Sequence, residues 1–461
     1  MAGEQQHNKH LHIAMFPWFA VGHIKPYMHL SNKLAEQGHQ ISFFLPSKTL
    51  PLVSSSNAHP DLITLIPIPL PRVPGLDPNV QTTADCDFAT HHLLATAFDA
   101  TSPFIESSLH KLKPDVVLYD FAYWLPQVAK RTGALAVAFT IVCCAAIAHL
   151  LIPRRKEDIT VADVCHVPED FPHADLTLLK HEALVTCTLY ATPFGQGVSV
   201  MERITNGLMN SEAILFKTCR EMDGRYLDYI EKVSKKVVMA AGPTLPVPPS
   251  TPLKEDLAVW LGKFKPKSVV YCAFGSEWVL CLDQFQELLL GIELTGLPFL
   301  IALKPPVEAE SLEAAMPEGF KQRTEERGVV TGEWVQQQQI LAHESVGCFV
   351  THCGSGSITE GLISECQLVL APQAGDQPIT ARVMSQDLRV GVEIEEGDED
   401  GLFDLHGVCR AIERVMNTEN GIGKEVKINH DKWRRVLLSP GLEKTYLDEF
   451  VMKLKQLISS Q

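Results

Sequence analysis

Short apolar runs alternate with longer amphipathic stretches along the chain, which is the pattern of β-strands joined by α-helices. The first run, His12–Phe16, is followed by a loop through Gly22–His23 and by a helix that should end at Gly38. A second run, Gln40–Leu45, comes directly after it, so the beginning of the chain predicts a parallel strand–helix–strand unit. Further strands are expected at Leu62–Ile66, Val116–Tyr119, Ala134–Phe139 and Ala213–Phe216, and the prolines from Pro67 to Pro78 predict an irregular loop.

The same rhythm restarts after a second proline-rich stretch, Pro243–Pro252, which has the composition of a linker between domains. We expect an α/β protein with two Rossmann-like βαβ domains facing across a cleft, in which 1–243 and 255–443 form the domains, 244–254 the linker, and 444–461 a helix that packs back on the first domain. The elements expected in the second half are strands at Val269–Phe274, Phe299–Leu303, Gly347–Thr351 and Leu368–Ala371 and helices at Gln284–Thr295 and Lys444–Ile458.

One apolar segment, Ala134–Ile152, is long enough to cross a bilayer. The alternative is a buried strand followed by a buried helix. We favour this alternative, because Gly133 and the helix-like segment before it make the strand part of a βαβ unit. No membrane span is therefore expected.

Composition narrows the class of partner. The 461 residues include 40 lysines and arginines against 55 aspartates and glutamates, a net charge of −15, which would repel a nucleic acid backbone. We expect the acidic run Glu395–Asp400 to be a solvated loop. The 12 cysteines form no Cys-x-x-Cys pair and the N-terminal residues are polar, so we expect reduced thiols, no signal peptide and a cytoplasmic protein.

The densest group of chemically suggestive residues follows the expected strand Gly347–Thr351. There His352–Ser357 forms a Gly/Ser turn that leads into a helix, and such a turn presents free backbone N–H groups to an anion. The turn holds no lysine, so it is not the P-loop of a nucleoside triphosphatase. It suits a diphosphate leaving group held by amides, the Ser357 hydroxyl and the His352 imidazole, with Glu360 one turn further on to accept from ribose hydroxyls.

The whole stretch from Trp334 to Gln377, 44 residues long, resembles the signature box of the plant family-1 UDP-sugar glycosyltransferases. The resemblance implies the GT-B fold and a UDP-sugar as co-substrate, with no separate cofactor. By the same resemblance, the donor-binding residues are Trp334 stacked on uracil, Val335 and Gln337 around base and ribose, Glu360 on ribose, His352, Gly354, Ser357 and Ser276 on the diphosphate, and Asp376 and Gln377 on the sugar.

The box departs from the family at one point. Where the family commonly has Trp-Asn, this chain has Ser355-Gly356. Gly356 carries no side chain, so the contact that Asn makes is lost or taken over by the backbone. A further candidate for the donor sugar is Thr140, at the end of the strand Ala134–Phe139.

The candidate base is His23, in the loop after the first strand. An unperturbed imidazole has a pKa of about 6.5 and can accept a proton near pH 7. Asp120 follows the strand Val116–Tyr119 and can orient that imidazole through its other nitrogen. The family uses the same His–Asp pair as its catalytic machinery.

These residues predict an inverting displacement in which a hydroxyl, deprotonated by His23, attacks the anomeric carbon of a UDP-sugar, with UDP-glucose the expected donor. Parts of the chain resemble branch-forming members of the family, so the expected acceptor is a flavonoid or anthocyanin 3-O-glucoside. UDP-rhamnose or UDP-xylose as donor, and an aglycone or another glycoside class as acceptor, remain alternatives, as does a non-catalytic nucleotide-sugar-binding protein. We expect a monomer without a metal site.

Overall fold

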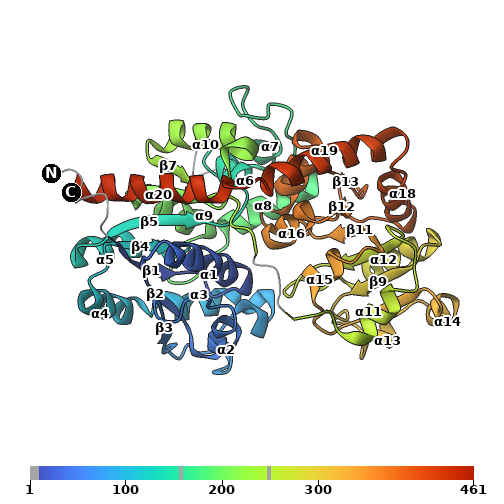
Figure 1. Ribbon diagram of the computed structural model, residues 1–461, viewed down its shortest axis with the longest axis horizontal. Helices are drawn as coiled ribbons and strands as arrows, with labels where there is room; N and C mark the ends of the chain where they lie inside the picture. Colours follow the sequence, from blue (N-terminus) through green and yellow to red (C-terminus); the bar gives the residue numbers. More distant parts are fainter. Residues whose placement is uncertain (1–9, 155–158, 247–250, 461) are drawn as a thin grey trace. The chain divides into compact units, whose positions relative to one another are not determined.

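The computed structural model describes residues 10–154, 159–246 and 251–460, whose contacts group into two compact units (Figure 1). The first unit comprises Met1–Pro153, Thr188–Pro246 and Pro440–Gln461, and the second comprises Arg154–Cys187 and Val247–Ser439. Residues 1–9 and part of the expected linker, 247–250, lie outside the described residues. The domain boundaries expected from the sequence stay a prediction.

The first unit is built on a seven-stranded, wholly parallel sheet in the order β3-β2-β1-β4-β5-β6-β7. Its strands are β1 (His12–Phe16), β2 (Gln40–Pro46), β3 (Ile63–Ile68), β4 (Val116–Tyr119), β5 (Leu135–Thr140), β6 (Ala213–Phe216) and β7 (Val237–Ala240). Its helices are α1 (Val21–Glu36), α2 (Leu50–Ser54), α3 (His91–Asp99), α4 (Ser102–Leu112), α5 (Leu125–Thr132), α6 (Cys144–Leu150), α9 (Val200–Asn210), α10 (Arg220–Ser234) and α20 (Leu442–Ser459).

The strands expected in this half are confirmed, with two differences. The sequence analysis missed β7, a run of only four residues. It also ended the third strand before Pro67, whereas β3 continues through Pro67, which pairs in register with Leu45. Since β3 lies at the edge of the sheet, one side of it needs no backbone donor, and a proline is tolerated there.

Helix α20, at the C-terminal end of the chain, belongs to the core of the first unit (Figure 1). Its buried face, Leu447, Phe450, Val451 and Leu454, lies in one hydrophobic cluster with residues of the sheet and of α1. The hydroxyl of Tyr446 donates to Glu221 at 2.7 Å and accepts from the backbone N–H of Arg220 at 2.7 Å. The end of the chain therefore stabilises the sheet that carries the candidate base.

The long apolar segment Ala134–Ile152 folds as expected, into strand β5 and the short buried helix α6. Within the described residues, every helix is too short or too polar to cross a membrane.

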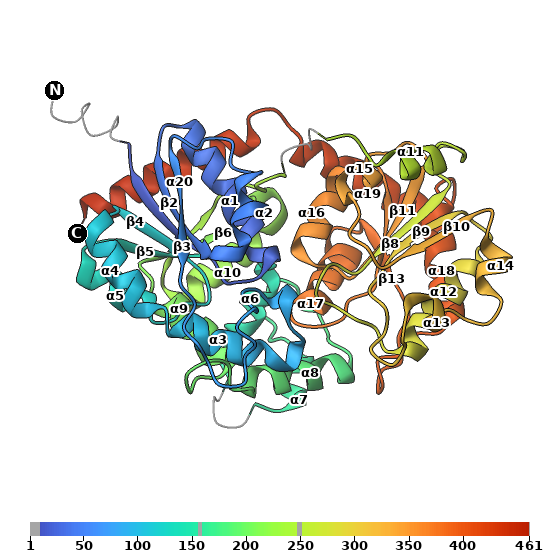
Figure 2. The same ribbon diagram turned by 90° about the horizontal axis from the view of Figure 1, so that it is seen from below.

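The second unit contains a six-stranded parallel sheet in the order β10-β9-β8-β11-β12-β13 (Figure 2). Its strands are β8 (Val269–Ala273), β9 (Phe299–Ala302), β10 (Gly328–Thr331), β11 (Val346–Thr351), β12 (Gln367–Leu370) and β13 (Gly391–Glu393). Its helices are α7 (Val161–Cys165), α8 (Lys180–Ala191, which begins in this unit), α11 (Glu255–Leu261), α12 (Leu282–Leu294), α13 (Leu312–Ala315), α14 (Phe320–Thr324), α15 (Gln337–Leu341), α16 (Ser355–Ile363), α17 (Gln377–Arg382), α18 (Leu405–Met416) and α19 (Gly421–Leu437), with a π-helix at Val383–Asp387.

Each sheet has one point where the strand order reverses direction. In the first unit this point lies between β1 and β4, and in the second between β8 and β11. Open α/β sheets bind ligands beyond the carboxyl ends of the two strands at this point, because their loops diverge there. The fold therefore directs attention to the residues after β1 and β4 and to those after β8 and β11.

Candidate active site

His23 and Asp120 meet at the reversal point of the first sheet. Nδ1 of His23 lies 2.6 Å from Oδ2 of Asp120, and the two side chains are only 17% and 7% exposed. Because an ionised carboxylate can only accept, Nδ1 carries a proton, and in the neutral form of the ring Nε2 is the nitrogen that can accept one. The sequence analysis placed His23 in a loop, which is wrong, since α1 begins at Val21 and His23 lies in its first turn.

The turn between β11 and α16 holds the expected diphosphate-binding residues. Gly354 is the N-cap of α16, and Gly356 and Ser357 lie in its first turn, where backbone N–H groups lack helical partners. The His352 ring lies so close to Gly354 and Gly275 that a Cβ added at either glycine would approach its Nε2 to 2.6 or 2.9 Å. A side chain at either position would therefore have to displace the ring.

Burial lowers the pKa of His352 to about 4, with a smaller opposing effect from the backbone of Ala273. The imidazole is therefore neutral near pH 7 and has a single N–H, for which a bound ligand would compete with the backbone of Ala273. Ser276, the other expected diphosphate contact, lies three residues after the end of β8 and is exposed. Gly275 after β8 and Gly354 after β11 thus both lie against the His352 ring.

The expected base- and ribose-binding residues form a second group in the same unit. The Trp334 side chain is 72% exposed, so its face is open to a flat ligand, whereas Val335 is buried. The Gln337 amide donates to Glu360 at 2.8 Å and to the Ser357 hydroxyl at 3.3 Å. Residues of the signature box that are about 20 positions apart are therefore joined by hydrogen bonds.

Two residues of this group were missed by the sequence analysis. Gln338 donates to the second oxygen of Glu360 at 3.2 Å, and the hydroxyl of Tyr271 donates to Gln337 at 3.2 Å. A carboxylate accepts about four hydrogen bonds, so Glu360 keeps capacity for a ribose hydroxyl. Gln338 could have been suspected from the sequence because it is adjacent to Gln337. Tyr271 could not, because it lies 66 positions before Gln337.

The expected sugar-binding residues lie at the start of α17. Asp376 is its N-cap residue and Gln377 its first residue. The side-chain oxygen of Gln377 accepts from the backbone N–H groups of Gln373 at 3.0 Å and Ala374 at 3.2 Å. The side-chain oxygen of Gln377 thus holds the backbone of the loop before α17, and its NH₂ group is the part of the amide that can donate to a ligand.

Two weaker candidates are also placed by the fold. Thr140 is the last residue of β5, half-buried at the carboxyl end of the first unit's sheet. Gly356 is exposed, and a Cβ added there would meet nothing within 4 Å. The missing side chain at 356 therefore leaves open space.

Within the described ranges, one group of side chains brings three possible metal-ligand atoms within 4.8 Å of one another: His181, Glu182 and Glu396. Arg382 donates to both oxygens of Glu182, at 3.0 and 3.2 Å, and also pairs with Glu393. A metal ion would have to displace or lie beside this guanidinium. We therefore interpret the group as an ion-pair network of the second unit.

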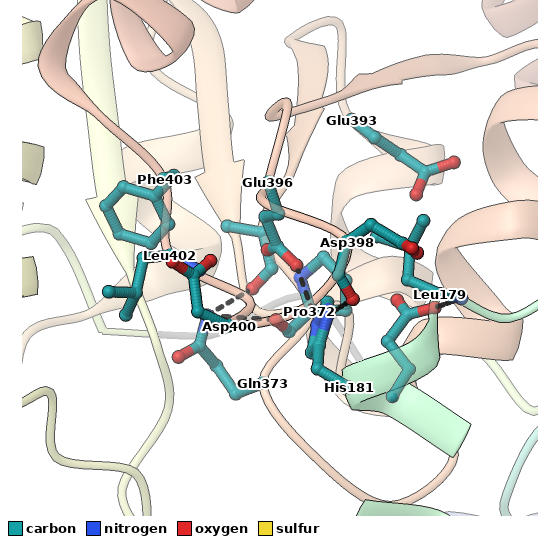
Figure 3. Close-up of polar contacts among 12 residues, drawn as sticks. Leu179, His181, Pro372, Gln373, Glu393, Glu396, Asp398, Asp400, Leu402 and Phe403 are labelled. Carbon is teal, nitrogen blue, oxygen red and sulfur yellow. Dashed lines mark hydrogen bonds and ion pairs between the residues drawn. The ribbon is translucent and has the colours of Figure 1, made fainter. Parts of the chain in front are cut away.

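The same network corrects the expectation of a fully solvated acidic loop. The side chain of Glu396 is 7% exposed and lies 3.4 Å from Nε2 of His181, whose Nδ1 faces the carbonyl of Asp398 (Figure 3). The pKa of His181 is raised mainly by this contact with Glu396. Glu395 and the residues from Asp398 to Asp400 are exposed, so the solvated part of the run is shorter than expected.

Residues 311–454 match the family model described as UDP-glucoronosyl and UDP-glucosyl transferase. The chain is 48% identical to a cyanidin 3-O-galactoside 2''-O-xylosyltransferase of Actinidia chinensis var. chinensis and 47% identical to an anthocyanidin 3-O-glucoside 2''-O-glucosyltransferase of Ipomoea nil. Each alignment covers 97% of this chain and 98% of the relative.

The chain therefore belongs to the family of UDP-glycosyltransferases. It also resembles the solved structure of a UDP-glucose:anthocyanidin 3-O-glucosyltransferase in complex with UDP, with a TM-score of 0.77 over 98% of this chain and 100% of that one. The sequence identity in that comparison is 23%, so it shows the fold alone, which is the GT-B fold expected from the signature box.

Proposed function

We propose that this enzyme moves a sugar from a UDP-sugar to a hydroxyl of a sugar already attached to an anthocyanidin or related flavonoid, with inversion at the anomeric carbon. The observation that carries the proposal is the 2.6 Å contact between Nδ1 of His23 and Asp120, the arrangement in which a carboxylate orients an imidazole that acts as a base through Nε2. A sugar hydroxyl is a weak nucleophile, and a positioned base accelerates such a step by about 10²–10⁴-fold.

In the proposed mechanism, Nε2 of His23 accepts the proton of the acceptor hydroxyl as that oxygen attacks the anomeric carbon. The bond from this carbon to the UDP oxygen breaks in the same step, and the configuration inverts. Asp120 stabilises the imidazolium that forms without taking the proton. The leaving diphosphate gains negative charge, which the first-turn N–H groups of α16, the Ser357 hydroxyl and the neutral His352 would meet.

The remaining roles in the donor site follow the positions of the side chains. The exposed indole of Trp334 would stack on uracil beside Val335. Glu360, held by Gln337, would accept from the ribose hydroxyls. Asp376 and Gln377, at the first turn of α17, would bind the transferred sugar, and Thr140 and Ser276 are further candidates for donor contacts.

We propose UDP-glucose as the donor. Gln377 would donate from its NH₂ group to a sugar hydroxyl, because its oxygen is engaged by two backbone N–H groups. The two relatives carry different names in this respect, one a xylosyltransferase and the other a glucosyltransferase. Competition between UDP-glucose, UDP-xylose and UDP-rhamnose tests the assignment, and faster turnover of either alternative donor would contradict it.

We propose a glycosylated acceptor because both relatives are named for transfer to the sugar of an anthocyanidin 3-O-glycoside. Phe121 adds an apolar surface beside the base, with its ring centroid 5.7 Å from that of His23, and such a surface suits a flat polyphenol. The test is kcat/KM for cyanidin, its 3-O-glucoside and its 3-O-diglycoside. Higher efficiency on cyanidin itself would contradict a branch-forming activity.

The same assay decides between an enzyme of this kind and a protein that only binds nucleotide sugars. UDP release from UDP-glucose should depend on the glycoside acceptor and should be abolished in the His23→Ala variant. We further propose that the enzyme works as a monomer in the cytoplasm, since one chain supplies both groups of site residues and the 12 cysteines, all in the described part of the chain, form no disulfide.

A further inference from the structure

The turn that carries Asp120 has an unfavourable backbone conformation. Phe121, directly after Asp120, has a φ of +46°, which only glycine adopts readily. The N–H of Ala122 donates to the carbonyl of Asp120, so that the chain reverses tightly around Phe121. Such a conformation is unfavourable for a residue with a side chain and persists only where the surrounding contacts enforce it.

Arg203, on α9, supplies the contact that enforces it. Its Nη1 donates to the carbonyl of Phe121 at 2.9 Å. The other hydrogen bonds of the guanidinium run to Asp99, at 2.9 and 2.6 Å, and to the carbonyl of Phe194, at 3.0 and 2.7 Å. A guanidinium has five N–H donors, and all five are therefore used.

Asp99, the last residue of α3, is equally saturated. Besides the two bonds from Arg203, it accepts from the indole N–H of Trp124 at 3.1 Å and from the backbone N–H of Gln196 at 3.0 Å. The side chains of Arg203 and Asp99 are 0% and 1% exposed. Hydrogen bonds of this buried pair thus connect four segments: α3, α9, the turn after β4 and the loop around Phe194.

This pair is difficult to explain by stability alone. Replacing a buried ion pair with apolar side chains of similar volume is often neutral or stabilising, because desolvation offsets the attraction. A fully bonded guanidinium does, however, fix the position of each carbonyl that it contacts. The carbonyl of Phe121 belongs to the residue that follows Asp120, and the Phe121 ring lies against His23.

We propose that Arg203, neutralised by Asp99, is a positioning residue for the catalytic pair, because it holds the turn that places Asp120 against His23. It touches neither substrate and acts through Asp120. The inference rests on the proposed function, since it assigns a role in the same proton transfer. A misplacement of about 1 Å in such a pair can cost about a hundredfold in rate.

A double-mutant cycle tests the proposal. Arg203→Lys keeps the positive charge beside Asp99 but has three donors instead of five. It should lower kcat by about tenfold to a hundredfold and leave KM for UDP-glucose unchanged. In an Asp120→Ala background the same substitution should have almost no further effect, because the group it positions has gone. Equal losses in both backgrounds, or unchanged kcat in Arg203→Lys, would overturn the proposal.

A control variant separates positioning from loss of stability. Leu109→Ala, in the buried face of α4, removes apolar packing in the same unit and should lower the melting temperature by an amount similar to Arg203→Lys. Its kcat, corrected for the folded fraction, should stay at the wild-type value. If kcat in Leu109→Ala falls as far as in Arg203→Lys, the effect of Arg203 is merely structural and the proposal fails.

A spectroscopic measurement makes the test independent of turnover. The proton between His23 and Asp120 should give a resonance far downfield of the amide region, identified by its loss in His23→Ala. It should be lost or shifted in Arg203→Lys and retained in Leu109→Ala. Absence of transfer by the wild-type enzyme would refute the proposed function, whereas an unchanged resonance in Arg203→Lys would refute the positioning role alone.

A milder variant covers the case in which Arg203→Lys does not fold. Trp124→Phe keeps an aromatic ring, although a smaller one, and loses the N–H that donates to the Asp99 carboxylate. It should lower kcat about threefold, less than Arg203→Lys, because the other hydrogen bonds of the pair remain. The downfield resonance should move in the same direction as in the other variants. No change in either measurement would count against the proposal.

Discussion

The two groups of site residues are built in opposite ways. The donor box of the second unit is contiguous in sequence, from Trp334 to Gln377, and its expected diphosphate contacts are neutral groups: backbone N–H groups, a hydroxyl and an uncharged imidazole. The catalytic pair of the first unit joins residues 97 positions apart, and it consists of an imidazole and a carboxylate in direct contact. Each arrangement fits the chemistry of its ligand. A diphosphate is stabilised by several fixed dipoles, whereas proton transfer depends on one well-positioned base.

This difference predicts which kinetic parameter each region controls. A change in the catalytic pair should act on kcat, because His23 contributes most in the transition state. A change in the donor box should act mainly on KM for the UDP-sugar. The variants below challenge this division, beginning with the largest expected effect.

His23→Ala should abolish nearly all transfer, a loss of about 10²–10⁴-fold in kcat, because general base catalysis has that size. UDP should still bind with unchanged affinity in a calorimetric titration. The protein should still fold, but the melting temperature should fall, since the His23 side chain is only 17% exposed and its loss removes a contact of the buried Asp120 carboxylate. Retention of more than about a tenth of wild-type turnover would show that another group acts as the base.

Asp120→Asn should lower kcat by about a hundredfold or more while KM for UDP-glucose stays constant. The amide keeps the shape of the carboxylate but cannot stabilise the imidazolium and can impose the wrong tautomer on His23. Comparison with Asp120→Ala measures the part due to charge. Similar turnover of Asp120→Asn and wild type would mean that the 2.6 Å contact serves only the fold.

His352→Ala should weaken UDP binding about tenfold, because a hydrogen bond to a charged group contributes about 1.5–3 kcal/mol. His352→Gln is the matched control, since its amide can still donate. As burial lowers the pKa of His352 to about 4, this contribution to binding should not vary between about pH 5.5 and 8. A loss confined to kcat, with unchanged affinity for UDP, would contradict the assigned role.

The comparison also explains what the sequence could predict. Strands such as β1, β4, β8 and β11 follow from continuous apolar runs, and the donor box follows from local spacing. Strand β13, with only three residues, gives too short a pattern. Arg203 and Asp99 escaped notice because nothing in the local sequence of a charged residue indicates burial, and their contact joins positions 104 apart. Glu396 was missed for the same reason.

Acid should destabilise the fold through buried histidines in both units. Burial, the largest cause in each case, lowers the pKa values of His29, His39 and His352 to about 4, below the value of about 6.5 expected in the unfolded chain. Between these values the unfolded chain binds more protons, so stability is fully present above about pH 6.5 and falls as the pH drops towards 4.

His39 offers the clearest test, because its Nδ1 accepts the backbone N–H of Leu11 at 2.9 Å and a protonated ring cannot accept. His39→Asn, whose oxygen can accept the same bond, should reduce proton uptake on unfolding by about one proton. The measurement is the urea midpoint at about pH 7.5 and about pH 5.5, with the exposed His110→Asn as control. An equal drop in midpoint for wild type and His39→Asn would exclude this contribution.

Gly356→Asn should produce the smallest change in kinetics of these variants, and it tests directly whether the donor box controls KM and not kcat. The position lies in the first turn of α16, a Cβ there would meet nothing within 4 Å, and the family that the box resembles commonly has Asn. We expect KM for UDP-glucose to fall about threefold, with kcat nearly constant, because one exposed hydrogen bond contributes about 0.5–1.5 kcal/mol. Gly356→Ala is the control: it removes the flexibility of a helical glycine, about 0.5–1 kcal/mol, without adding a polar group. If both variants change KM equally, the gain comes from a stiffer helix N-terminus, and the open space at Gly356 holds no part of the donor.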